Sequence, residues 1–393
     1  MSQRLIDRSP DLKRLRDEGY AIELRAGHLA VRSVPYVATD RTVHCGVLVS
    51  ELTLAGDVTA RPSTHVISFA GSHPCNKDGV EINQIRHSAS VRRIDDTLTV
   101  DRSFSAKPPQ GYRDYYEKVT AYVRILETAA QFIEPGATAR VFPAMETDED
   151  DSVFNYVDTS SSRGGTSGLA AKMAGQRIGI IGVGGTGSYV LDFVAKTPVR
   201  EIHLFDDDVF SQHNAFRSPG AASLEELQSK PKKAIYFRQK YSRMHRGIVA
   251  VDARIDSSNV ELLRQLDFVF LCLDKGGAKA AIIETLEETG VPFIDVGMGV
   301  ELIDGALFGV LRVTTSTAAK RDHVRVKNRI PLSDREDDDD YARNIQIAEL
   351  NALNAALAVI RWKKLLGFYH DPEREHHCTY TIDGNCLINE DHA

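Results

Sequence analysis

The pattern of apolar and polar positions predicts an antiparallel sheet with helices in the first third of the chain. Residues 10–18 have the periodicity of a short helix, which Gly19 ends. Three segments then alternate apolar and polar residues between glycine, proline and aspartate breaks: YAIELRAGHLAVRSVPYV, VHCGVLVSELTLAG and STHVISFAG. Helical spacing returns between about 112 and 133. Residues 1–144 are therefore predicted to form an α+β domain.

Strands and helices alternate in the second half of the chain. Short apolar runs predict strands, at 177–183, 201–205, 247–252, 267–272 and 291–296, with a further apolar segment at 299–313. Helical patterns follow them, at 185–196, about 230–244, 258–265, 276–289 and 341–367. This alternation is typical of a doubly wound, Rossmann-like, mostly parallel α/β sheet, which we assign to residues 169–393.

The segment between these regions has a different composition. Residues 145–168 are first acidic and then rich in serine and glycine. Such a sequence buries little apolar surface, so it is predicted to be a linker.

Overall composition limits the classes of function. The chain has 393 residues, of which 42% are hydrophobic and 26% charged, as in globular proteins. Its net charge of −7 argues against a nucleic-acid binder, because such proteins neutralise phosphates with clustered lysine and arginine. The sequence shows neither a membrane-length apolar run nor a signal peptide, so we expect a cytoplasmic protein without a membrane partner.

The cysteines do not form a recognisable framework. There are five, with no CxxC pair, so neither a disulfide framework nor a structural zinc site is expected. His376, His377, Cys378 and Cys386 lie close together in the sequence, but their irregular spacing favours surface residues over a metal site.

A glycine-rich turn, GVGGTG, lies where a predicted buried strand gives way to a helix. Gly182, Gly184, Gly185 and Gly187 allow unusual backbone angles and let a phosphate approach the helix N-terminus. Asp206 follows the next strand, 24 residues after Gly182, and suits recognition of a ribose. At this point NAD, FAD and ATP all fit the pattern.

Later residues favour ATP over a dinucleotide. Asp208, Asn214 and Arg217 follow on one loop, the segment SKPKKA begins a helix with lysines, and Asp274 ends another strand. Cations that neutralise phosphate charge and a carboxylate for Mg²⁺ are what phosphoryl or nucleotidyl transfer needs. A hydride transfer does not need them, so an NAD-dependent oxidoreductase remains only an alternative, as does a non-catalytic nucleotide-binding scaffold.

This order of residues resembles the ThiF/MoeB and ubiquitin-activating adenylyltransferase family over about residues 165–370. The shared pattern is G-x-G-G-x-G, then D-x-D and N-x-x-R, then a lysine, then an aspartate. The resemblance implies that Asp206 holds the ribose and that Asn214 and Arg217 bind the phosphates. It also implies that Asp274 holds magnesium.

Three assignments within this pattern each leave two interpretations open. The family lysine is Lys232 or Lys233, and the apolar register of the following helix favours Lys233, at Ala234, Phe237, Tyr241 and Met244. Asp208 is either a nucleotide ligand or a turn residue. Arg163 either reaches the phosphates of the other protomer, since family members work as pairs, or is an ordinary linker charge.

The resemblance also implies a reaction. The C-terminal carboxylate of a ubiquitin-like or sulfur-carrier protein would attack the α-phosphate of ATP in a homodimeric enzyme. The cysteine that accepts the acyl group in many members is missing from residues 312–345. The reaction therefore stops at the adenylate, uses a hydroxyl among Thr314, Thr315, Ser316 and Thr317, or uses Cys378 or Cys386.

The first region contains a weaker resemblance. RPSTHVISFAGSHPCNKDGVEI is similar to the segment of ubiquitin-conjugating enzymes that leads to their catalytic cysteine. Here Cys75 replaces the asparagine of the turn, and Ile82 stands at the catalytic position. We therefore expect His73 and Cys75 to be turn and packing residues, in an inactive domain that docks the ubiquitin-like protein or a conjugating-enzyme-like partner.

Overall fold

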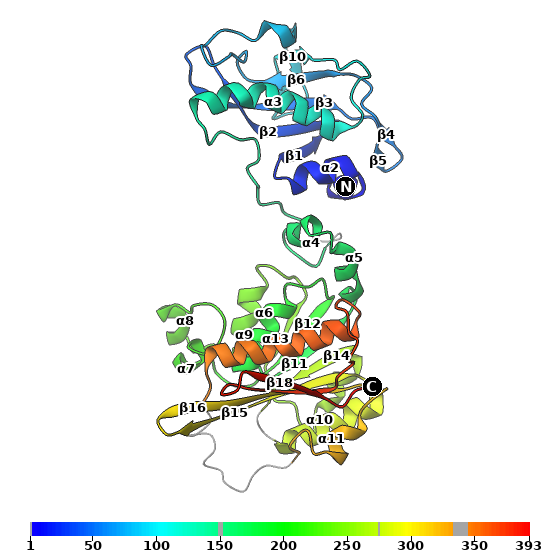
Figure 1. Cartoon of the computed structure of the whole chain (residues 1–393), viewed down its shortest axis with the longest axis vertical. Coiled ribbons are helices and arrows are strands. Elements are labelled where there is room, and N and C mark those ends of the chain that lie inside the picture. The colour runs from blue at the N-terminus through cyan, green and yellow to red at the C-terminus, as the bar shows by residue number, and fades with distance from the viewer. Residues whose placement is uncertain (1, 148–151, 274–275, 333–344) are drawn as a thin grey trace. The chain divides into compact units, whose positions relative to one another are not determined.

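The computed structural model describes residues 2–147, 152–273, 276–332 and 345–393 (Figure 1). The chain divides into two compact units. The first comprises Met1–Asp151 and Tyr156–Gly164, and the second comprises Ser152–Asn155 and Gly165–Ala393. Each unit is described separately below.

The first unit is a six-stranded antiparallel sheet with helices packed against it. Its strand order is β1-β2-β3-β6-β10-β7. The strands are β1 (Ala21–Arg25), β2 (His28–Val37), β3 (Val43–Glu51), β6 (Val66–Ala70), β7 (Arg86–Ser88) and β10 (Arg102–Ser105). Two short pairs accompany them, β4 (Leu54–Ala55) with β5 (Val58–Thr59) and β8 (Arg92–Arg93) with β9 (Thr99–Val100). The predicted α+β architecture of this region is confirmed.

Three helices complete the first unit, α1 (Ser2–Arg8), α2 (Pro10–Asp17) and α3 (Tyr115–Ile133). Helix α3 begins where the Asp114 side chain accepts a hydrogen bond from Glu117 N. One stripe of α3, including Tyr115, Tyr122 and Leu126, is fully buried in the core that it shares with the sheet. Figure 1 shows α3 lying across the sheet.

The turn that resembles conjugating enzymes is packed in the first unit. Cys75 is fully buried with Val37 and Ala130, and its backbone N–H donates to Val37 O. His73 is 6% exposed and contacts the Phe104 ring edge to face. Both are therefore packing residues, as predicted.

The predicted linker contains regular structure. Helices α4 (Thr159–Arg163) and α5 (Ser167–Ala170) lie within it. Phe154 is only 8% exposed and forms a bridge with His245 of the second unit, to which residues 152–155 belong. The segment therefore contains helix α4, the start of α5 and one buried aromatic side chain, and its role as a linker stays a prediction.

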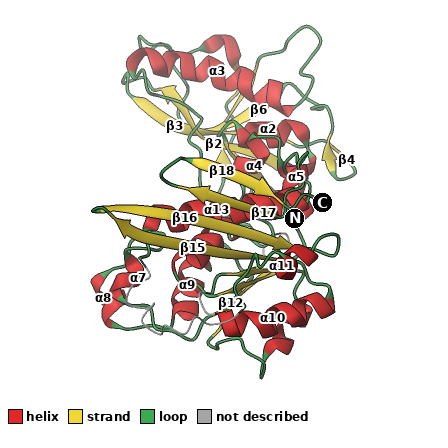
Figure 2. Ribbon diagram, turned by 60° about the horizontal axis from the view of Figure 1, so that its bottom comes forward, coloured by secondary structure: helices red, strands yellow, loops and turns green. Residues whose placement is uncertain are grey.

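The second unit is an eight-stranded mixed sheet in the order β13-β12-β11-β14-β15-β16-β17-β18. The strands are β11 (Arg177–Ile181), β12 (Glu201–Phe205), β13 (Ile248–Val251), β14 (Phe268–Leu271), β15 (Phe293–Ile303), β16 (Ala306–Ser316), β17 (His377–Thr381) and β18 (Cys386–Glu390). The strands from β13 to β15 are parallel, and those from β15 to β18 are antiparallel (Figure 2). The predicted Rossmann-like α/β sheet is confirmed, but its second half is antiparallel because residues 293–316 form one long hairpin.

Helices cover both faces of this sheet. They are α6 (Gly185–Val194), α7 (Gln212–Ala215), α8 (Leu224–Gln228), α9 (Lys233–Tyr241), α10 (Gly276–Thr289), α11 (Asp322–Val326) and α13 (Ala348–Leu365). One core contains apolar residues of α6, α9 and α13, and a second contains those of α10 and α11. Among the described residues, no helix is both long and apolar enough to cross a bilayer.

The histidines near the C-terminus are buried, which corrects the expectation of surface residues. His376 and His377 are each 3% exposed. Their rings hydrogen-bond to hydroxyls at the end of β16, His377 Nδ1 with Thr314 Oγ1 at 3.0 Å and His376 Nε2 with Thr317 Oγ1 at 3.1 Å. These partners come from a strand about sixty residues earlier, so local spacing did not reveal them.

Acid is expected to destabilise the second unit through His377. Burial lowers the pKa of His377 from 6.5 to about 4, with Arg329 and Arg312 adding to the effect. The unfolded chain then binds this proton more readily than the folded chain, so the contribution to stability is complete above pH 6.5 and is lost as the pH falls toward 4. We expect a loss of roughly 2 kcal/mol between pH 7 and pH 5. Urea unfolding of wild type and His377→Gln at both pH values tests this, and an equal pH dependence in the two proteins would contradict it.

Candidate nucleotide site

The glycine turn is packed so tightly that three of its four glycines have no room for a side chain. A Cβ on Gly187 would lie 1.9 Å from Gly182 O, one on Gly182 would lie 2.6 Å from Cys272 O, and one on Gly185 would meet the Asn351 side chain at 2.5 Å. Gly182 also has a φ of +85°, which favours glycine. Gly184 differs, because a Cβ there would meet nothing within 4 Å. The turn therefore holds strand, helix and neighbouring elements together and leaves one open position, Gly184.

A pocket opens at this turn, at the carboxyl ends of the parallel strands. It encloses about 980 Å³ of empty space, counting the part open to solvent. Its lining includes Gly182, Gly184, Gly185, Asp206, Asp208, Arg217 and Lys233. Of the four glycines expected to bind the cofactor, Gly187 does not line the pocket. It instead packs against the carbonyl group of Gly182 within the turn.

Asp206 fixes the position of the glycine turn. Its carboxylate oxygens accept hydrogen bonds from Val183 N and Asp208 N, each at 2.9 Å. The residue is 8% exposed, and burial raises its pKa against the opposing effect of Lys233 and these N–H groups. A carboxylate oxygen accepts more than one hydrogen bond, so Asp206 keeps capacity for ribose hydroxyls.

The two candidate lysines face different surroundings. Lys233 begins α9, lines the pocket, and places Nζ 2.7 Å from Asp208 Oδ2 and 3.7 Å from Asp206 Oδ1. Lys232 precedes the helix, and its Nζ instead contacts Asp207 O at 2.6 Å and Asp252 at 3.3 Å. Lys233 also holds the pKa of the Asp208 carboxyl below its usual value. The geometry brings Lys233 and Asp208 to the pocket and leaves Lys232 outside its lining.

Two buried donors on the segment after β12 have no partner in the described chain, and one of the two residues, Arg217, lines the pocket. Asn214 is 3% exposed, and its Oδ1 accepts from Ser211 N while its Nδ2 makes no hydrogen bond to any described residue. Arg217, which lines the pocket, likewise has a buried Nε without a partner among these residues. Unpaired buried donors cost free energy, and an anionic ligand would satisfy them. The residues present therefore fit the phosphates of a nucleotide.

The magnesium prediction lies outside the described structure, because Asp274 is not among the described residues. The carboxylates of Asp206, Asp207 and Asp208 lie within 4.8 Å of one another. However, Asp206 already accepts two backbone N–H groups, and Asp208 pairs with Lys233. The described carboxylates alone do not make a prepared cation site.

The hydroxyls considered as acyl acceptors lie away from the pocket. Ser316 pairs in register with Phe293 at the start of β15, whereas the pocket is lined by Val296, Gly297 and Met298 farther along that strand. Ser316 is 2% exposed, and Thr317 Oγ1 bonds to His376. Neither of these side chains, nor Thr314 or Thr315, is among the residues that line the pocket. Their role as acyl acceptors stays a prediction.

The cysteines of the C-terminal hairpin are the other candidate acceptors. Cys378 pairs with Val313 in the middle of the antiparallel half, and burial raises the pKa of its thiol to about 11. Cys386 is exposed on the edge strand β18. Neither lines the pocket.

Arg163 belongs to the first unit, where its guanidinium lies 5.0 Å from the centre of the Phe142 ring. It does not line the pocket of this chain. Its reach to a second protomer stays a prediction.

The comparison with protein families decides what this pocket belongs to. The sequence model of the ThiF family matches residues 163–375, more than half of the chain. The chain belongs to the ThiF family. A second model, described as a domain of unknown function (DUF6791), matches residues 10–159, ahead of the ThiF domain.

Individual relatives of the ThiF domain are distant. Ubiquitin-like modifier-activating enzyme 5 of Drosophila ananassae is 24% identical over 139 residues, which cover 33% of this chain and 35% of that protein. The chain thus spans about a third of that relative's length. E. coli MccB with ATP is 15% identical with a TM-score of 0.45, covering 60% of this chain and 70% of that one. PaaA is 14% identical with a TM-score of 0.44, covering 57% and 76%.

Several pocket residues of the ThiF domain were missed by sequence reasoning. Arg254 follows β13 and lines the pocket, as do Gln346 and Asn354 near α13. Asn351, also on α13, accepts a hydrogen bond from Thr186 Oγ1 of the turn. No local motif marks them, although the apolar stripe of α13 is interrupted by buried asparagines, which was an available signal.

A matched pair of substitutions separates structural from ligand-facing glycines in the ThiF domain. Gly187→Ala is expected to lower the free energy of unfolding by about 3 kcal/mol or more, because the new Cβ would clash with the backbone carbonyl group of Gly182. Gly184→Ala is expected to change stability by less than about 1 kcal/mol and to weaken nucleotide binding, since its Cβ points into open space. Chemical denaturation and ATP titration measure both effects. Equal stability of the two variants would contradict this packing.

Proposed function

We propose that the ThiF domain binds ATP and adenylates the C-terminal carboxylate of a ubiquitin-like or sulfur-carrier protein, releasing pyrophosphate. The observation that carries the proposal is a pocket that Arg217 shares with a glycine turn at a helix N-terminus, with Arg217 Nε and Asn214 Nδ2 buried and without a partner among the described residues. Membership of the ThiF family supports it.

In the proposed reaction, bonds form and break only in the two substrates, and no protein group reacts covalently. An oxygen of the ionised carboxylate forms a bond to the α-phosphorus, and the bond from that phosphorus to the pyrophosphate oxygen breaks. No proton moves, so no general base is required. Catalysis then depends on alignment and on neutralising the developing charge. Arg217 and Lys233 supply positive charge, Asn214 and the turn amides supply donors, and Asp206 orients the ribose.

Magnesium accompanies this function as a proposal. Asp274 would hold the ion beside the phosphates, where it would neutralise charge on the leaving pyrophosphate. We also propose a cytoplasmic homodimer in which Arg163 of one protomer serves the site of the other. In the same scheme the first unit docks the ubiquitin-like protein or a conjugating-enzyme-like partner.

ATP–pyrophosphate exchange tests the proposed function. Labelled pyrophosphate should enter ATP only when the correct carboxylate-bearing protein is present, because exchange requires reversible adenylation. Candidate ubiquitin-like and sulfur-carrier proteins are supplied in turn to the full chain. Saturable binding of NAD, with no exchange for any partner, would overturn the proposal.

A further inference from the structure

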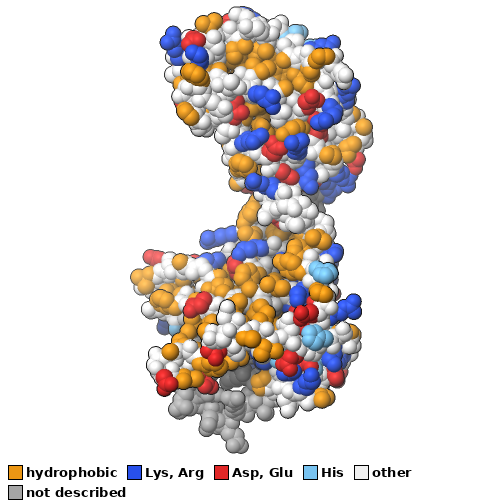
Figure 3. All heavy atoms as spheres, in the orientation of Figure 1, with side chains coloured by type: hydrophobic (Ala, Val, Ile, Leu, Met, Phe, Trp, Pro, Cys, Tyr) orange, Lys and Arg blue, Asp and Glu red, His pale blue; other side chains and the backbone are white. Residues whose placement is uncertain are grey.

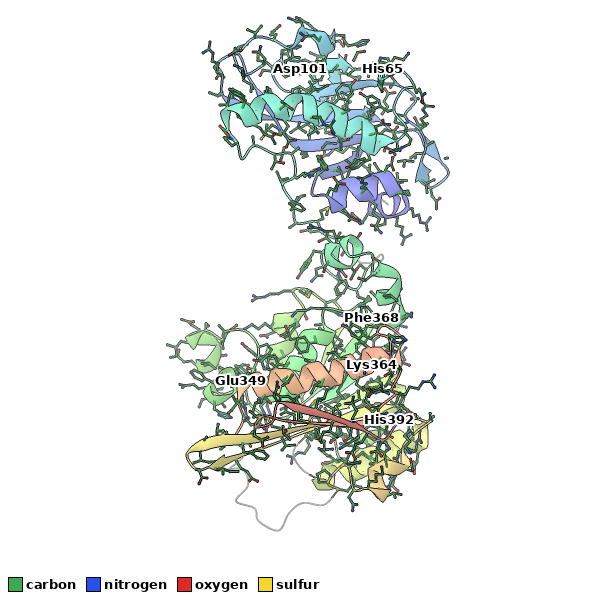
Figure 4. All side chains as sticks on the ribbon, viewed as in Figure 1. His65, Asp101, Glu349, Lys364, Phe368 and His392 are labelled. Atoms are coloured by element: carbon green, nitrogen blue, oxygen red, sulfur yellow. The ribbon has the colours of Figure 1, made fainter. Side chains whose placement is uncertain are left out.

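Helix α13 carries two buried asparagines near the glycine turn, of which Asn354 lines the pocket and Asn351 contacts the turn. Asn351 and Asn354 are both fully buried. Figure 4 shows α13 crossing the second unit from Glu349, in its first turn, to Lys364, in its last. Asn351 has both ends of its amide satisfied within the chain, since Oδ1 accepts from Thr186 Oγ1 and Nδ2 donates to Ile347 O.

Asn354 is satisfied at one end only. Its Nδ2 donates to Gly297 O at 3.0 Å, whereas its Oδ1 has no hydrogen-bond partner among the described residues. Asn354 lines the pocket, so its side chain belongs to the wall that a ligand would meet. A buried acceptor that receives no hydrogen bond raises the free energy of the protein, so a hydrogen bond from a ligand donor would remove that penalty.

The position of Asn354 along the sheet indicates which part of the ligand it meets. It contacts β15, whereas Asp206 ends β12, and β11 and β14 lie between these strands. Neighbouring strands are about 4.8 Å apart, so the ends of β12 and β15 are about 14 Å apart. The ribose and its base belong at Asp206, and the phosphates belong over the turn after β11. The acyl group therefore occupies the β15 side.

The wall on the β15 side is suited to a peptide rather than to further phosphate. Val296, Gly297 and Met298 line it together with Asn354, and none of these carries charge. The charged lining residues that the structure describes come from α9 and from the segments that follow β12 and β13; they are Asp206, Asp207, Asp208, Arg217, Lys233 and Arg254. A peptide backbone offers N–H donors, and an amide oxygen accepts them.

We infer that Asn354 is a specificity-determining residue that reads the C-terminal backbone of the acyl substrate. Its Oδ1 accepts one of the last two peptide N–H groups, while its Nδ2 remains on Gly297 O. The inference rests on the proposed adenylation. It predicts selection for a substrate whose last two residues carry free N–H groups, that is, without proline or N-methylation there.

Acyl-adenylate analogues test this without knowledge of the natural substrate. The probes are 5′-O-sulfamoyladenosine, its acetyl-Gly-Gly acyl derivative, and two forms of that derivative in which one or the other amide nitrogen is methylated. Affinities for the full chain are measured by calorimetry. In wild type, the acetyl-Gly-Gly probe binds more tightly than sulfamoyladenosine, and methylating one of the two nitrogens weakens binding about 5- to 10-fold, the effect of one hydrogen bond.

Variants locate this effect at Asn354. Asn354→Leu should bind the methylated and unmethylated probes equally, while its affinity for sulfamoyladenosine stays close to that of wild type. Asn389→Leu, the matched control, should keep the discrimination, because Asn389 lies on the edge strand β18 and does not line the pocket. Thermal melting checks that each variant folds.

The outcomes separate the two proposals. If methylation at neither nitrogen weakens binding to wild type, the role of Asn354 is wrong, whatever the variants do. The same holds if Asn354→Leu discriminates as wild type does. Failure of wild type to bind sulfamoyladenosine at all would instead overturn the nucleotide site and with it both proposals.

Discussion

Replacing Arg217 with alanine is expected to lower the rate of ATP–pyrophosphate exchange by about 10²–10³-fold, as removal of one preorganised donor does in other enzymes. Arg217 lines the pocket, and its buried Nε has no partner in the described chain. Since this Nε makes no hydrogen bond to the described residues, loss of the side chain should lower catalysis more than stability. The unfolding free energy should change by less than about 1 kcal/mol.

Arg200→Ala is the matched control for Arg217. Arg200 is an exposed arginine just before β12, at the amino end of that strand and away from the pocket, where it approaches Glu201. Exchange by this variant should equal that of wild type. If Arg217→Ala also keeps wild-type exchange, the Arg217 guanidinium does not contact the phosphates and the site is assigned wrongly.

Lys233→Ala should lower exchange by a similar factor, about 10²–10³-fold, while Lys232→Ala changes it by less than about fivefold. The Nζ of Lys233 stands between Asp206 and Asp208 inside the pocket. Its side chain is 9% exposed, compared with 41% for Lys232. Loss of Lys233 removes a cation from the phosphates and also leaves two carboxylates facing each other, so ATP binding should weaken along with turnover.

Adjacent lysines make this a sharp comparison, because both substitutions remove the same charge from the same helix start. Exchange rate and ATP affinity are measured for each variant. A larger loss in Lys232→Ala than in Lys233→Ala would reverse the assignment. Equal losses would indicate that only the net charge of this helix start matters.

Local sequence signals predicted the parts of the site that are close in the chain. A buried strand, a glycine turn and a helix follow one another within twenty residues, so their pattern specified both the fold and the pocket floor. The register of α9 likewise favoured the lysine that the structure places in the pocket.

Contacts between distant segments could not be read in the same way. The pairing of His376 with Thr317 spans 59 residues, and the contact of Asn351 with Thr186 spans 165. The sequence showed that the segments of β15 and β16 are apolar, but it did not show that they form a hairpin. That hairpin, which makes this half of the sheet antiparallel, depends on a tight turn at Asp304 and Gly305, both with positive φ. Only the net charge could be predicted from the sequence, and not its distribution over the surface. Figure 3 shows lysines and arginines interspersed with acidic residues on the face drawn.

The 165-residue separation between Thr186 and Asn351 also bears on how the protein is made. The glycine turn is synthesised well before α13, which forms one wall of its pocket. A nascent chain that stops before α13 has the turn without that wall, and the buried face of α6 that packs on α13 stays exposed. The pocket is therefore completed only after α13 has been synthesised.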